Sequence, residues 1–161
     1  MKNWLVKIFF RKKVPEDELD ESTVLYFADC CFPVKNDQAV KLLNNGMSYS
    51  VHRSICLKSS NPSDPQQKST NFNWDVCKKI KLYKSKIAVL IENEIGNLKT
   101  VIDCIVCMRI NIFSINTANI FEDFFECTIV VEIEDLVVLN RLLDELGELQ
   151  AVYSAVRYLE S

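Results

Sequence analysis

The order of apolar patterns over residues 87–159 is the feature that most constrains what this chain can fold into. A short apolar run at 87–91 is typical of a buried strand, and apolar residues then recur at helical spacing over 98–105. A run rich in β-branched residues at 110–115 and an alternating apolar run at 125–133 predict two more strands. This part of the chain therefore starts as strand, helix, strand, strand.

A second helix and a last strand complete the pattern. Asp135 is a suitable N-cap and Gly147 a suitable stop for a helix whose leucine stripe we expect to be buried, namely Leu136, Leu139, Leu143 and Leu146. The apolar run at 152–159 predicts the closing strand. This order is that of the ferredoxin-like βαββαβ fold, an antiparallel four-stranded sheet with both helices on one face.

The first half of the chain is less regular. A short apolar run predicts a strand at 24–27, and residues 39–43 form another short apolar element. Phe72 and Trp74 alternate with polar residues as they would in a strand. Residues 59–70 are rich in Ser, Pro, Asn and Gln and predict a loop. Before these elements, an apolar and basic stretch at residues 1–13 predicts a short helix, and an acidic stretch at 15–21 predicts an exposed linker.

The distribution of charge also separates the two halves of the chain. Residues 1–86 hold 15 of the 19 basic residues and 9 of the 22 acidic residues, whereas residues 87–161 hold 4 and 13. The first half is therefore basic and compatible with a phosphate backbone as partner, and the acidic second half would repel one.

Seven cysteines without a secretory signal pattern indicate a reducing compartment, and we expect a cytoplasmic protein. An odd number of cysteines cannot all pair within one chain, so metal binding or burial accounts better for them. No run approaches the roughly 20 apolar residues of a membrane span, and we expect no membrane partner.

The cysteines and the single histidine of the first half suggest a metal site. His52 and Cys56 have the three-residue gap common in zinc sites, and Cys30 and Cys31 supply two more thiols. A small segment with little core of its own would gain stability from zinc. Adjacent cysteines seldom both reach one ion without a strained chain, and burial as plain thiols is the alternative for some of the four.

The run at 25–33, Leu-Tyr-Phe-Ala-Asp-Cys-Cys-Phe-Pro, resembles the double-cysteine motif of RelA/SpoT-type (p)ppGpp synthetase/hydrolases. In that family the motif is followed by a Gly-Asp pair, a Gly-containing turn, a Ser-Val-His-Arg run, a nearby cysteine and a Trp-bearing strand. This chain has the corresponding residues in the same order at Asn36-Asp37, Gly46, 50–53, Cys56 and Trp74. The resemblance implies three parts: an N-terminal extension and linker at 1–23, a zinc-finger-like α/β module at 24–76, and an α+β domain at 77–161.

The ferredoxin-like ending resembles the ACT domain, the amino-acid-sensing module that closes those enzymes. The resemblance implies a homodimer through this domain and an effector site at the loop before the first helix, faced by the second strand, with the residues Asn93, Gly96, Asn97, Leu98 and Asn111. The family usually has Asp-Arg-x-Gly before this helix, whereas this chain has Asn-Glu-Ile-Gly at 93–96.

The resemblance implies a regulatory fragment that is not an enzyme by itself, because the family's catalytic domains have no counterpart in this sequence. The family's double-cysteine module docks on ribosomal RNA, which implies RNA contacts for Lys35, Lys41 and Arg53. The implied partners are the ribosome, a separately encoded catalytic half and an amino-acid effector. A stand-alone ACT-type small-molecule sensor and a vestigial fragment of a split gene remain as alternatives.

Overall fold

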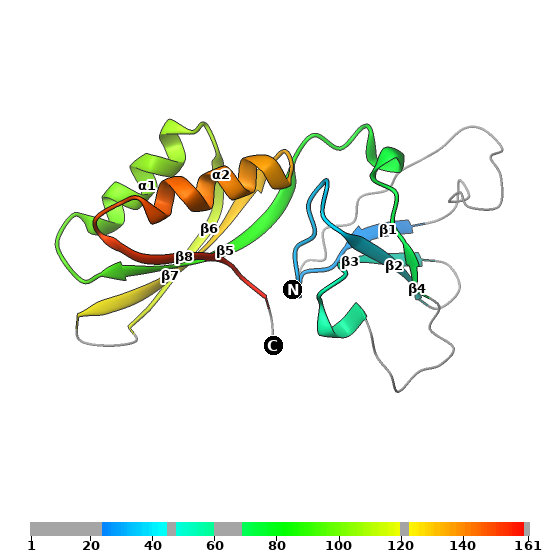
Figure 1. Cartoon of the computed structure of the whole chain (residues 1–161), viewed down its shortest axis with the longest axis horizontal. Helices are drawn as coiled ribbons and strands as arrows, with labels where there is room; N and C mark the ends of the chain where they lie inside the picture. Colours follow the sequence, from blue (N-terminus) through cyan, green and yellow to red (C-terminus); the bar gives the residue numbers. More distant parts are fainter. Residues whose placement is uncertain (1–23, 45–47, 60–68, 120–122, 160–161) are drawn as a thin grey trace. The chain divides into compact units, whose positions relative to one another are not determined.

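The computed structural model describes residues 24–44, 48–59, 69–119 and 123–159, so the helix and linker predicted before residue 24 lie outside the described residues. The chain is a mixed α+β protein, as predicted, and divides into two compact units (Figure 1). The described part of the first unit comprises residues 24–33, 38–44, 48–59 and 69–73, and that of the second unit comprises residues 34–37, 74–119 and 123–159.

The first unit is built on a mixed sheet. The sheet has the strand order β1-β3-β2-β4, in which β1 runs parallel to β3 and the other neighbours are antiparallel. Leu25, Leu42 and Val51 are buried in this unit. The described elements of the unit are β1 (Val24–Phe27), β2 (Ala39–Asn44), β3 (Ser48–Arg53), the 3-10 helix η1 (Leu57–Ser59) and β4 (Ser69–Asn71).

The strand expected around Phe72 and Trp74 lies earlier in the chain. The strand is β4, whose three residues are all exposed and polar, and it forms by backbone pairing with β2. Trp74 instead begins a 3-10 helix, η2 (Trp74–Cys77). Its indole N–H donates to the carbonyl of Asp37 at 2.8 Å, and its ring meets Tyr83 edge-on with 5.5 Å between centroids. These tertiary contacts override the alternating pattern, and residues 69 and 70 belong to a strand rather than to the predicted loop.

The second unit has the predicted βαββαβ order. Its sheet has the strand order β6-β7-β5-β8 with every pair antiparallel, and Figure 1 shows α1 and α2 on the same face of it. The elements are β5 (Tyr83–Glu92), α1 (Asn97–Cys107), β6 (Asn111–Asn119), β7 (Phe124–Ile133), α2 (Leu136–Gly147) and β8 (Val152–Arg157). Neither helix of the described residues is long and apolar enough to cross a membrane.

The core of the second unit lies between this sheet and the two helices. Every second residue of β7 is buried, as its alternating sequence predicts. The Asp135 carboxylate caps α2 by accepting from the backbone N–H groups of Val137 and Val138 at 2.9 and 3.0 Å. The buried stripe of α2 differs from the predicted one, because Leu142 is fully buried whereas Leu136 and Leu143 are only half-buried.

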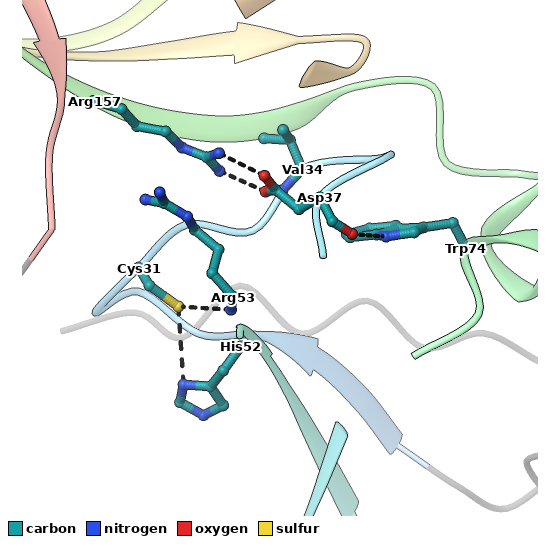
Figure 2. A network of polar contacts seen from close by, with 7 residues as sticks. All are labelled: Cys31, Val34, Asp37, His52, Arg53, Trp74 and Arg157. Carbon is teal, nitrogen blue, oxygen red and sulfur yellow. Dashed lines mark hydrogen bonds and ion pairs between the residues drawn. The ribbon is translucent and has the colours of Figure 1, made fainter. Parts of the chain in front are cut away.

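The short segment Val34–Asp37 packs with the second unit, although strands of the first unit flank it in the sequence. The Asp37 carboxylate forms a bidentate ion pair with the Arg157 guanidinium, with both N–O distances at 2.7 Å (Figure 2). The same carboxylate accepts from the Val34 backbone N–H at 2.7 Å, and the backbone N–H of Leu136 donates to the carbonyl of Lys35 at 2.9 Å. These bonds make the segment part of the second unit's structure.

Candidate metal centre

A tight turn after β1 carries the two adjacent cysteines, Cys30 and Cys31, and orients both toward the same cluster. The backbone N–H groups of Cys31 and Phe32 both donate to the carbonyl of Ala28, at 3.3 and 2.9 Å. Phe32 closes the turn in the left-handed region with φ 45°, which costs an L-residue about 1–2 kcal/mol. The strain expected from using neighbouring cysteines is therefore present, and it is located at the residue that follows them.

The other two residues come from the end of β3. His52 lies on β3 opposite Val40 of β2, and its side chain is buried. Cys56 follows in a turn in which its backbone N–H donates to the carbonyl of Arg53 at 3.0 Å, and it is buried as well. Because β1 and β3 are parallel neighbours, the turn after β1 and the turn after β3 lie at the same end of the sheet.

The four side chains converge at distances that suit one metal ion. Cys30 Sγ lies 3.4 Å from His52 Nδ1 and 3.6 Å from Cys56 Sγ, and Cys31 Sγ lies 3.9 Å from His52 Nδ1. All four potential ligand atoms lie within 4.8 Å of one another. Zn–S bonds of about 2.3 Å and Zn–N bonds of about 2.0 Å at tetrahedral angles place ligand atoms about 3.5–3.8 Å apart. The set Cys30, Cys31, His52 and Cys56 therefore fits a tetrahedral site, and every residue of the predicted set is present in it.

Burial sets the protonation of the cluster. It raises the pKa of Cys30 and of Cys31, and it lowers the pKa of His52, which nearby Lys58 lowers further. The thiols of Cys30 and Cys31 are thus held as neutral groups unless a cation replaces their protons, and the imidazole is held in the neutral form that can bind a metal. The backbone N–H of Arg53 donates to Cys31 Sγ at 3.4 Å, which supports a sulfur that carries negative charge (Figure 2).

A series of side-chain hydrogen bonds, which the sequence analysis does not predict, leads from His52 away from this cluster. The Nε2 atom of His52 lies 3.1 Å from Ser50 Oγ, and Asn44 Nδ2 donates to Ser50 Oγ at 3.0 Å and to the Tyr26 hydroxyl at 2.7 Å. One feature of the sequence indicates the contact between Ser50 and His52. The two residues are two positions apart, and residues two apart on a strand lie on the same face of the sheet.

The predicted effector residues divide between two ends of the second unit. Asn93 and Gly96 lie in the loop between β5 and α1, and Asn97 and Leu98 begin α1. Gly96 has φ 94°, and no side chain caps α1. Asn111 begins β6 at the other end of the sheet, where its side chain donates to Glu132 Oε2 at 2.6 Å. Since Glu132 pairs with Lys84 near the start of β5, Asn111 does not face the loop within one chain.

The predicted RNA-contact residues are distributed between the two units. Lys35 is exposed and belongs to the second unit. Lys41 and Arg53 lie on β2 and β3 of the first unit, and the ammonium group of Lys41 lies 5.5 Å from the centre of the Tyr49 ring. Arg53 is half-buried and its Nη1 atom is shielded from solvent, so the guanidinium is only partly accessible.

Residues 79–157 match the family model of the ACT domain. This part of the chain is therefore similar to the ACT domain, and it has the βαββαβ topology described above. No curated protein matches the chain.

Solved structures similar to this chain include two of the ACT domain from GTP pyrophosphokinase of Chlorobium tepidum. The crystal structure is 22% identical, with a TM-score of 0.43, and the match covers 48% of this chain and 99% of that one. The solution structure is 20% identical, with a TM-score of 0.44, covering 49% and 89%. The C-terminal domain of the MgtC protein from Mycobacterium tuberculosis is 21% identical, with a TM-score of 0.42, covering 48% and 87%.

Proposed function

We propose that this chain is a non-catalytic regulatory protein of the (p)ppGpp synthetase/hydrolase type, in which a zinc ion holds the first unit as a docking module and the ACT domain senses an amino acid and forms a homodimer. The observation that carries the proposal is the convergence of Cys30, Cys31, His52 and Cys56 at tetrahedral distances. These are the four residues that a double-cysteine motif of this type supplies. Zinc is the metal of choice because three thiols and one imidazole form a soft to borderline ligand set.

The zinc would act on structure rather than on a reaction. Four protein ligands leave no open position, which is the arrangement of structural zinc sites. The ion would fix the turn after β1 to the turn after β3 and offset the strain at Phe32. Ile55 and Leu57, which are 60% and 68% exposed beside Cys56, and Lys58, also exposed, would then be presented in one defined conformation.

We assign to this unit the docking on ribosomal RNA, through Lys41 and the accessible part of Arg53; Lys35, the third predicted RNA contact, belongs to the second unit. Phosphate contacts by lysine and arginine give affinity that falls with salt, whereas a preformed surface gives binding that persists at moderate salt. A separately encoded catalytic half is the second partner that we propose for this unit.

Co-sedimentation with ribosomes at low and moderate salt tests this proposal. We expect the wild-type protein to pellet at both salt concentrations with one zinc per chain, and Cys56→Ser to lose both the zinc and the pelleting at moderate salt. Cys107→Ser is the matched control, because Cys107 is an exposed cysteine outside the cluster. Pelleting that disappears at moderate salt in wild type, or that is equal in all three proteins, would refute specific docking.

The start of α1 supports amino-acid sensing as a function of the ACT domain alone. Gly96 turns the chain into α1 without a side-chain cap. The Asn97 N–H donates to the carbonyl of Glu94 at 3.3 Å, and the N–H groups that follow it in the first turn can meet a carboxylate. Binding of amino acids by wild type and its loss in Gly96→Val, measured by thermal shift, would support a sensor. If no amino acid raises the melting temperature of the wild type, the sensing role fails and the docking role is unaffected.

A further inference from the structure

The two ring nitrogens of His52 have different surroundings. Nδ1 faces the thiols, 3.4 Å from Cys30 Sγ, and Nε2 faces Ser50 Oγ at 3.1 Å. His52 and Ser50 are both buried, so each of their polar atoms needs a partner inside the protein. The ring orientation is therefore determined by contacts on both sides, of which the metal cluster supplies only one.

The side chain of Asn44 organises the second side. Its two amide hydrogens are both used, one by the Tyr26 hydroxyl at 2.7 Å and one by Ser50 Oγ at 3.0 Å. Ser50 Oγ has thus accepted one hydrogen bond and retains one lone pair and its own hydrogen. A hydroxyl in this state accepts the Nε2 hydrogen of the imidazole when Nδ1 gives its lone pair to a metal.

The hydroxyl hydrogens of Tyr26 and Ser50 can also find acceptors. Tyr26, Asn44, Ser50 and His52 line one cavity of about 280 Å³. A polar cavity of this size accommodates water molecules that accept the hydrogens of Tyr26 and Ser50. The hydroxyl groups of Tyr26 and Ser50 and both ring nitrogens of His52 can therefore all have partners with the metal in place.

We propose that Ser50, oriented by Asn44 and Tyr26, is a positioning residue for the metal centre: it accepts the Nε2 hydrogen of His52 and thereby directs Nδ1 at the metal. This inference rests on the proposed zinc site and goes beyond it by assigning residues outside the ligand set. Outer partners of a metal-bound histidine typically affect metal affinity by about 10–100-fold. Ser50→Ala should therefore weaken zinc binding by about tenfold or more, and Tyr26→Phe, one bond further away, by less.

His52 is the only histidine of the chain, so histidine labelled with ¹⁵N gives the signals of one imidazole. We would load the labelled full-length protein with ¹¹³Cd²⁺, record the coupling of each ring nitrogen to the metal, and measure zinc affinity by competition with a chelator. We expect coupling to Nδ1 and a slowly exchanging hydrogen on Nε2 in wild type. In Ser50→Ala the Nε2 hydrogen should exchange faster and the zinc affinity should fall.

Ser48→Ala is the matched control, because Ser48 lies on the same strand and bonds the backbone carbonyl of Asn44 instead of His52. It should keep the wild-type zinc affinity and the wild-type exchange of Nε2. Coupling through Nε2, or a zinc affinity of Ser50→Ala within twofold of wild type, would overturn this inference and leave the metal centre intact. If the wild type takes up neither cadmium nor zinc, the proposed metal centre itself is wrong, and this inference fails with it.

Discussion

The ion pair between Asp37 and Arg157 joins residues 120 positions apart, and its removal is the sharpest test of the second unit. The side chains of Arg157 and Asp37 are only 9% and 6% exposed. Asp37→Ala leaves the buried guanidinium without its carboxylate and deprives the Val34 N–H of its acceptor. Removing one partner of a buried pair costs about 3–5 kcal/mol. For a domain of this size, that loss lowers the melting temperature by more than about 10 °C.

Chemical denaturation followed by far-UV circular dichroism measures this loss. Asp37→Asn is an informative companion, because its amide oxygen can still accept from the Val34 N–H, whereas the charge and one of the two acceptors for Arg157 are lost. The double variant Asp37→Ala with Arg157→Met should recover much of the lost stability, since no buried charge remains. If the free energy of unfolding of Asp37→Ala lies within about 1 kcal/mol of wild type, the reasoning that this segment is part of the second unit is wrong.

Three further outcomes follow from local features of the second unit. Arg109 follows α1 in the left-handed region with φ 60°, so Arg109→Gly should raise the free energy of unfolding by about 0.5–1 kcal/mol, and an unchanged or lower value would count against backbone strain there. Asp135→Ala removes the cap of α2 and should lower the free energy of unfolding by about 1 kcal/mol in the same denaturation assay. Burial raises the pKa of Cys77 to about 12 and of Cys127 to about 11, so at pH 8 a thiol reagent should modify exposed Cys107 first and these two only on unfolding, as peptide mass mapping over time would show.

The succession of elements in the second unit could be predicted because it is encoded locally. The alternation along β7 and the helical spacing in α1 each follow from one short stretch, and Asp135 caps α2 through the N–H groups of Val137 and Val138, two and three residues further on. The four potential metal ligands could also be predicted from the sequence, since a histidine and three cysteines at these spacings form a recognisable ligand set.

The positions of residues relative to distant parts of the chain could not be predicted in this way. The pairing of Asn111 with Glu132 depends on strand register, which is fixed where β6 pairs with β7. The polar strand β4 exists because β2 offers it a free edge, and no apolar pattern marks it. The burial of Leu142 in place of Leu143 likewise depends on which side of α2 meets the sheet.

By itself the sequence determined which elements form and which side chains are chemically able to bind a metal, because propensity, periodicity and ligand type are properties of neighbouring residues. The tertiary structure decided where these side chains meet. The turn strained at Phe32 and the parallel pairing of β1 with β3 bring the thiols to His52, and Asn44 and Ser50 hold the far side of its ring. Such contacts join residues remote in the chain, and their geometry is set by packing rather than by any local pattern.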